Sequence, residues 1–198
     1  MRGRELALAE QLVNAESPRP SPAESVIVQA GRRVDGTGAK TARFPSANVN
    51  VVRQRIRTKL LENKTVALVT SAACGTDLLA LEVAEQMKIE AFILLPASPA
   101  TFRASSVTDR PGNWGDLFDQ VIKKAHTQVL TLSAGHQGYL ETNTKLLDTA
   151  QRLANTYDVE ARAMVVWNEE SRGPNDVTAH FLEQARVRHL PVIQISTL

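Results

Sequence analysis

The residues richest in potential chemistry are positions 71–77, which lie between an apolar run and an apolar helical pattern. Every side chain there is small or polar, so a ligand can approach the backbone closely. The N–H groups and the positive dipole end of the following helix favour an anion. We therefore predict a phosphate-binding turn, with Thr76 as helix N-cap, formed by Ser71, Ala72, Ala73, Cys74, Gly75, Thr76 and Asp77. The alternative is a plain tight connection between strand and helix.

A second polar segment follows an earlier apolar run and begins Gly31-Arg32-Arg33-Val34-Asp35. Gly31 permits an unusual backbone conformation, and either arginine could hold a phosphate through its forked donors. Asp35 could accept a hydrogen bond from a ribose hydroxyl. The alternative interpretation is a loop with ordinary exposed charges.

A third segment begins at Pro96 and is predicted to be a loop that lasts until a helix starts near Trp114. Such a long loop in a compact domain is usually functional. Phe102 offers a stacking surface for a base, and Arg103 offers donors. Core packing of Phe102 is the alternative.

Residues suited to catalysis are few. Asp35, Asp77 and Glu82 are the candidate catalytic carboxylates. Cys74 has neither a neighbouring base nor an oxyanion motif in the sequence, so a small buried cysteine is the favoured interpretation. The four histidines lack metal-ligand spacing, so we expect no metal site and no required cofactor.

Composition limits the classes of protein. The chain has 198 residues, of which 43% are hydrophobic and 22% charged, which suits one domain with a sizeable core. A net charge of +2 is too small to indicate a nucleic-acid partner. The single cysteine favours a reducing cytoplasm. No apolar run reaches the about 18 residues of a membrane-spanning helix, so we expect a cytoplasmic protein with no membrane partner.

The chain divides into two parts at about residue 25. Residues 5–14 could form a helix, but Pro18, Pro20 and Pro22 indicate an extended linker, so residues 1–24 are expected to be an N-terminal extension and residues 25–198 the domain. Strand patterns in the domain alternate with helix patterns: strands at 26–30, 66–70, 91–95, 128–132, 161–167 and 192–195, and helices at 46–61, 76–88, 114–125, within 140–157 and at 176–188. This alternation predicts a Rossmann-like, doubly wound α/β fold. Its sheet has about six mostly parallel strands with helices on both faces.

These motifs resemble the SLOG superfamily of Rossmann-like domains, named for bacterial DNA-processing proteins and the Lonely guy cytokinin-activating enzymes. The nearest branch occurs in bacterial multidomain signalling proteins. The matching segments, within residues 25–198, are 31–35, 44–45, 71–82, 95–96, 102–103 and 105–107. The resemblance implies that residues 71–76 bind a phosphate of a nucleotide-type ligand, with Arg33, Phe102 and Arg103 as further contacts.

The sequence departs from the enzymes of that superfamily. Lonely guy enzymes carry Pro-Gly-Gly-x-Gly-Thr-x-x-Glu with a catalytic glutamate, which residues 132–139 lack, and the third residue after Thr76 is Leu79. Arg32 also replaces the histidine of the branch's Gly-His-Arg motif.

Three functional hypotheses follow. The leading one is a domain of a bacterial signalling or conflict system that binds or senses a nucleotide-derived ligand without turnover. The second is an N-glycoside hydrolase that acts on a nucleoside monophosphate or an NAD-like substrate through Asp35, Asp77 or Glu82. The third is an interaction module with a vestigial site. We expect a fused or associated signalling module and homo-oligomers as possible partners, and we expect no nucleic acid.

Overall fold

The structure is a computed structural model that describes residues 24–132 and 135–198. The expected helix at residues 5–14 and the proline-rich linker lie outside the described residues. None of the described helices is both long and apolar enough to cross a membrane.

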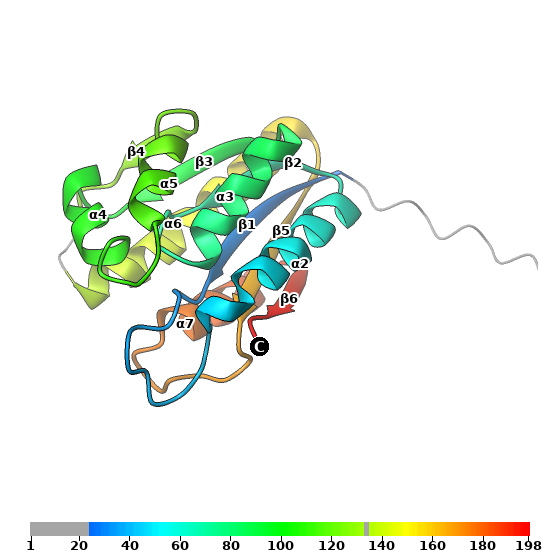
Figure 1. The fold of residues 1–198 in the computed structure, drawn as a ribbon. Helices are drawn as coiled ribbons and strands as arrows, with labels where there is room; N and C mark the ends of the chain where they lie inside the picture. The colour runs from blue at the N-terminus through cyan, green and yellow to red at the C-terminus, as the bar shows by residue number, and fades with distance from the viewer. Residues whose placement is uncertain (1–23, 133–134) are drawn as a thin grey trace, which may run out of the picture.

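Within the described residues, six parallel strands form one sheet in the order β4-β3-β2-β1-β5-β6 (Figure 1). From β1 the chain builds outward to β4 and then returns to place β5 on the other side of β1. The strand order therefore reverses between β1 and β5, and ligands of such sheets bind beyond the carboxyl ends of the strands at this switch point. The strands are β1 (Ser25–Gly31), β2 (Thr65–Thr70), β3 (Glu90–Leu95), β4 (His126–Val129), β5 (Glu160–Trp167) and β6 (Val192–Ser196).

Helices cover both faces of the sheet, as Figure 1 shows. Side chains alternate along a strand, so Ile27 of β1 packs on one face while Val26 and Val28 pack on the other. The core on the Ile27 side contains α2 (Val49–Glu62), α3 (Thr76–Met87), α4 (Pro99–Ser106) and α5 (Trp114–Val121), and the opposite core contains α6 (His136–Tyr157) and α7 (Val177–Val187). The predicted Rossmann-like, doubly wound fold is confirmed, and every strand pair is parallel.

The segment after β3 is not the long loop that we expected. Residues 99–106 form α4, because Ser98 caps this helix by accepting a hydrogen bond from the Thr101 N–H at 3.3 Å, and Pro99 occupies the first turn. The Ser-Pro pair was a readable start signal, since proline is favoured at the first position of a helix.

Four other elements differ from their predicted bounds by more than one residue, and one of them is α5, which ends at Val121 rather than at residue 125. β4 spans His126–Val129 rather than residues 128–132, and its four side chains are exposed, so no buried apolar run marks it. α6 begins at His136 rather than within residues 140–157. A 3₁₀ turn, η1 (Ser46–Asn48), precedes α2 where we expected one continuous helix.

Two neighbouring leucines of α2 provide a matched test of the core. Leu60 is fully buried, whereas Leu61 is 68% exposed. Leu60→Ala should lower the free energy of unfolding by about 2 to 5 kcal/mol, because it removes buried methyl groups and leaves a cavity. Leu61→Ala should change it by about 0.5 kcal/mol or less. Urea unfolding would measure both, and equal losses would contradict the packing of α2.

Candidate functional site

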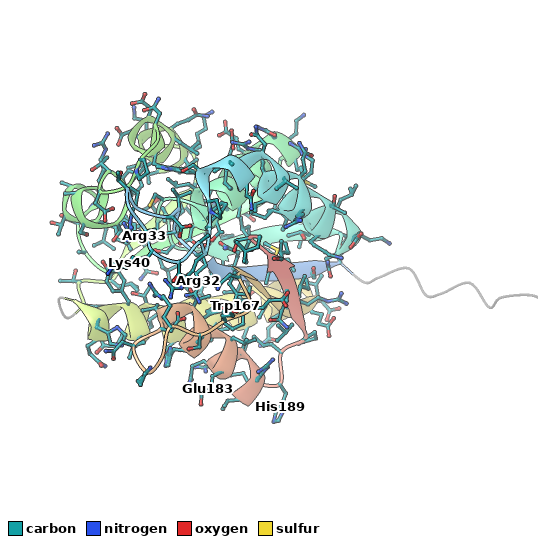
Figure 2. The ribbon with its side chains drawn as sticks, turned by 60° about the horizontal axis from the view of Figure 1, so that its bottom comes forward. Arg32, Arg33, Lys40, Trp167, Glu183 and His189 are labelled. Atoms are coloured by element: carbon teal, nitrogen blue, oxygen red, sulfur yellow. The ribbon has the colours of Figure 1, made fainter. Side chains whose placement is uncertain are left out.

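A cavity of about 410 Å³ lies beyond the carboxyl end of β1, beside the switch point. This volume is in the range of small-molecule sites. Its walls come from the end of β1 and the loop that follows, the starts of α3 and α7, parts of α4 and α6, and single residues of the loops before α5 and α7. Figure 2 shows three basic side chains of the β1 loop, Arg32, Arg33 and Lys40, between the helices of the two faces.

Arg32 anchors one wall of this cavity through a buried ion pair. Its Nη1 donates to Asp176 Oδ1 at 2.7 Å and its Nε to Asn168 Oδ1 at 2.9 Å. Its Nη2 donates to the Glu170 carbonyl at 2.5 Å, and its guanidinium lies 5.5 Å from the centre of the Trp167 ring. The side chain is 4% exposed. These partners use most of the donors that we expected Arg32 to offer to a phosphate.

Asp176, the partner of Arg32, also caps α7. Its Oδ1 accepts hydrogen bonds from the N–H groups of Thr178 at 3.0 Å and Ala179 at 3.3 Å. Burial alone would raise the pKa of this carboxyl, but the Arg32 guanidinium and the Arg172 N–H hold it well below its usual range. Asp176 is therefore a fixed negative charge that joins the β1 loop to α7.

Arg33 also lines the cavity, and its partners lie on the side of α3 and α4. It forms an ion pair with Asp109, and its Nε donates to Cys74 Sγ at 3.4 Å. Cys74 is 1% exposed, and burial raises the pKa of its thiol. Because a thiolate is the nucleophilic form, Cys74 is suited to packing and not to catalysis.

The turn between β2 and α3 is shaped by close contact with the β1 loop. Gly75, and not Thr76 as we expected, is the N-cap of α3, with φ of 95° and ψ of −126°. A Cβ at Gly75 would lie 2.7 Å from the Val34 nitrogen and 2.8 Å from the Arg32 carbonyl oxygen. Only glycine allows both this conformation and this approach, and Thr76 is the first residue of the helix rather than its cap.

Several N–H groups of this turn already have acceptors within the protein. Cys74 N–H donates to the Ser106 carbonyl at 3.0 Å, and Thr76 N–H to the Arg32 carbonyl at 3.2 Å. Ala73 N–H donates to Asp77 Oδ2 at 3.3 Å. The start of α3 therefore already faces a carboxylate from its own first turn.

Asp77 is the candidate carboxylate whose chemistry the fold alters most. It lines the cavity and is 7% exposed. Burial raises its pKa to about 7, although the Ala73 N–H and the Gln29 and Thr76 side chains lower it in part. Gln29 is itself held in place, because its Oε1 accepts from Thr70 at 2.7 Å. A carboxyl with this pKa can act as acid or base near neutral pH.

The other two candidate carboxylates have structural partners. Asp35 lines the cavity, but its Oδ2 accepts hydrogen bonds from the N–H groups of Arg43 and Phe44, both at 3.0 Å. Glu82 lies outside the cavity and forms an ion pair with Arg53 of α2 at 2.7 Å. Neither has the environment of Asp77.

The structure brings only part of the predicted ligand-binding set to the cavity. Phe102 contributes to its wall, yet it is 2% exposed and its ring stacks on Phe118 at 6.2 Å. Arg103 lies elsewhere and makes two 3.0 Å hydrogen bonds to Asp119. The predicted residues at the cavity are Gly31, Arg32, Arg33, Ser71, Ala73, Asp77 and Phe102, and those outside its lining are Ala72, Cys74, Gly75, Thr76, Pro96 and Arg103.

Sequence reasoning missed two groups of lining residues. The first is basic and comprises Lys40, Arg43, Arg110 and Arg172. The second lies on α6 and includes Tyr139, Thr142 and Asn143. Isolated cations in loops and polar residues inside a helix give no motif, although a polar stripe on an amphipathic helix could have drawn attention to α6.

No protein-family model and no curated protein matches this sequence. DNA processing protein A from Streptococcus pneumoniae is similar in structure, with a TM-score of 0.41 and 14% identity over 87% of this chain, which spans 59% of that one. DNA processing protein A from Helicobacter pylori, described for its single-stranded DNA binding mode, has a TM-score of 0.37 and 16% identity, and the match covers 85% of this chain and 75% of that one. Streptococcus suis SuiB, bound to S-adenosylmethionine, has a TM-score of 0.27 and 14% identity, and the match covers 97% of this chain and 50% of that one.

These similarities concern the fold. The chain is a Rossmann-like α/β domain with a basic cavity beside its switch point. At TM-scores of 0.41 or less, what the neighbours bind says nothing about this cavity.

The raised pKa of Asp77 predicts an unusual dependence of stability on pH. Between about pH 4 and pH 7 the folded protein keeps the proton of Asp77 while the unfolded chain releases it, so stability falls as pH rises through this window. As the pH rises from 5 to 8, the free energy of unfolding of Asp77→Asn should therefore increase by about 1 to 3 kcal/mol relative to that of the natural protein. Urea unfolding at both pH values measures this, and parallel pH curves for the two proteins would contradict it.

The contact between Gly75 and the β1 loop gives a second prediction. Gly75→Ala should destabilise the protein by about 2 kcal/mol or more, since strain at a positive φ adds to overlap with backbone atoms. Gly38 is the matched control, because its φ is 78° and no atom lies within 4 Å of an added Cβ. Gly38→Ala should cost about 1 kcal/mol. Similar thermal unfolding of both variants would argue against the close approach.

Proposed function

We propose that this domain binds a nucleotide or a nucleotide-derived ligand in the cavity beside the switch point, as a sensor. The observation that carries the proposal is the charge of the cavity wall. Six of its lining side chains are basic (Arg32, Arg33, Lys40, Arg43, Arg110 and Arg172) and two are acidic (Asp35 and Asp77). Arg32 and Arg33 are paired with Asp176 and Asp109, so the excess of positive charge that favours a phosphate-bearing ligand comes from the other four cations.

Two of these cations are free to meet a ligand. Lys40 and Arg43 form no ion pair with any residue in the described ranges. Arg110 is only weakly paired, since its Nε is 3.7 Å from Asp109 and lacks a hydrogen-bond partner among the described residues. A buried donor without a partner is costly, and a ligand oxygen would satisfy it.

The cavity suits a small molecule better than a nucleic-acid strand. Strand-binding grooves usually present several aromatic side chains for bases to stack on. Here Phe102 is packed on Phe118, and the Tyr139 hydroxyl is 2.9 Å from Ser106 Oγ. Among residues 24–132 and 135–198, no open row of aromatic side chains lines the cavity.

A second candidate function rests on Asp77. A buried carboxyl with a pKa of about 7, at the wall of a cavity of nucleotide size, is suited to general acid or base catalysis. This favours an N-glycoside hydrolase that acts on a nucleoside monophosphate or an NAD-like substrate. The two candidates differ in one product, because only the hydrolase releases free base.

A thermal-shift screen would test the proposal, with AMP, ADP, ATP, NAD, ADP-ribose, cyclic dinucleotides and a single-stranded oligonucleotide as probes. At about 100 times its dissociation constant, a ligand stabilises the folded state by about 2.7 kcal/mol, which raises Tm by about 5 to 10 °C for a domain of this size. A shift without base release supports a sensor, and base release that Asp77→Asn abolishes supports the hydrolase. A shift with the oligonucleotide alone, or with no probe, contradicts both.

Two arginine variants would locate the site. Arg43→Ala should lower the affinity for any nucleotide that raises Tm, and the loss should be about tenfold because the substitution removes a charged contact. Arg103→Ala is the control, since this arginine pairs with Asp119 away from the cavity and its loss should leave affinity unchanged. Equal effects of the two substitutions on affinity would place the ligand elsewhere.

A further inference from the structure

The two ends of the cavity differ in burial and charge. At the exposed end lie Lys40, Arg43, Arg110 and Arg172, each partly or fully exposed. At the buried end lie Asp77, Thr142 and Asn143, which are 7%, 3% and 3% exposed. Arg32 is a buried lining cation as well, but its guanidinium is committed to Asp176, Asn168 and the Glu170 carbonyl. A ligand that fills the cavity therefore meets its available cations near solvent and uncharged or acidic groups inside.

The polar groups at the buried end are mainly acceptors. Thr142 uses its hydroxyl proton to reach the Gly138 carbonyl at 2.7 Å, so its oxygen is left to accept. Asn143 Nδ2 lies 2.9 Å from the Val177 carbonyl oxygen and 3.2 Å from His180 Nδ1, which leaves its Oδ1 as the uncommitted atom of the amide. The Asp77 carboxylate is a third acceptor.

The β2–α3 turn adds few donors to this buried end. Of residues 71–77, only Ser71, Ala73 and Asp77 line the cavity, and the Ala73 N–H already donates to Asp77 Oδ2. A phosphate there would lie beside the Asp77 carboxylate and would find few free donors. Burying an anion without donors is strongly unfavourable.

We infer, on the basis of the proposed function, that the nucleotide binds with its phosphate at the exposed basic end and a neutral, hydrogen-bond-donating group at the buried end. Lys40, Arg43 and Arg110 hold the phosphate. Asp77, Thr142 and Asn143 accept hydrogen bonds from the neutral group, which is either the ribose diol or an amino group of the base. This orientation is the reverse of the one that a phosphate-binding turn at residues 71–76 would give.

Backbone amide shifts of the isotope-labelled full chain would test the orientation, with inorganic pyrophosphate and AMP as probes. Pyrophosphate should shift residues 36–43 and Arg110 and leave residues 72–76 unmoved. AMP should shift the same residues and also Asp77, Thr142 and Asn143. Shifts at residues 72–76 with pyrophosphate would overturn the orientation and leave the proposed function intact. Binding of pyrophosphate but not of AMP would overturn the proposed contact of a neutral group with the buried end. Binding of neither probe would overturn the whole inference, and the wider thermal-shift screen would then decide the proposed function.

Two analogues of AMP distinguish the sources of the neutral donor. Inosine monophosphate lacks the amino group, and 2′,3′-dideoxy-AMP lacks the ribose diol. The analogue that lacks the donor in contact with the buried end should bind about fivefold more weakly than AMP. Equal affinities for all three would overturn the inference.

Asp77→Asn provides an independent measurement. In the proposed orientation it should lower the ratio of AMP affinity to pyrophosphate affinity by about fivefold, because the neutral group loses the carboxyl acceptor. With phosphate at the turn, the same substitution would remove a repulsion, and binding of both probes would tighten. Arg103→Ala should leave the ratio unchanged. Thermal unfolding of each variant confirms that the comparison is made between folded proteins.

Discussion

The buried ion pair between Arg32 and Asp176 is the interaction on which the arrangement of the site depends. It joins the end of β1 to the start of α7 across the point where the strand order reverses. The same arginine lies on Trp167 and reaches the backbone of the loop after β5. Breaking a buried pair leaves an uncompensated charge, so this contact is costly to lose. With this end of the loop fixed, Arg33 is directed toward Asp109 and Cys74, and the cavity takes its shape between the two helical layers.

Much of the fold could be predicted from the sequence because short apolar runs and amphipathic helices have distinct periods. The strands β1, β2, β3 and β5 are mainly apolar and mostly buried, and each began within one residue of its prediction. β4 was misplaced since its four side chains are exposed and carry no such pattern. α4 was missed because its helical apolar stripe is very short, with only Phe102 and Ser106 buried.

The site was predictable only in part, for a related reason. Segments next to a strand end, such as Gly31 to Arg33 and Ser71 to Asp77, are marked by the strand that precedes them. Lys40, Arg110 and Asn143 reach the same cavity through tertiary packing, and no local pattern marks them. The role of Asp77 also depends on burial by surrounding elements, so its raised pKa could not be derived from its neighbours in sequence. Motifs located the cavity, and packing determined its chemistry.

The walls of the cavity differ in how firmly the fold holds them. α3 is buried along most of its length, so the side formed by Asp77 is fixed by the core. Residues 37–42 of the opposite wall are all exposed and belong to no helix or strand. Closing this stretch around a ligand costs backbone conformational entropy of about 1 to 2 kcal/mol per ordered residue. A change in the stiffness of this loop at positions other than Lys40 would therefore tune the affinity of the proposed ligand without altering a cation that is proposed to hold it.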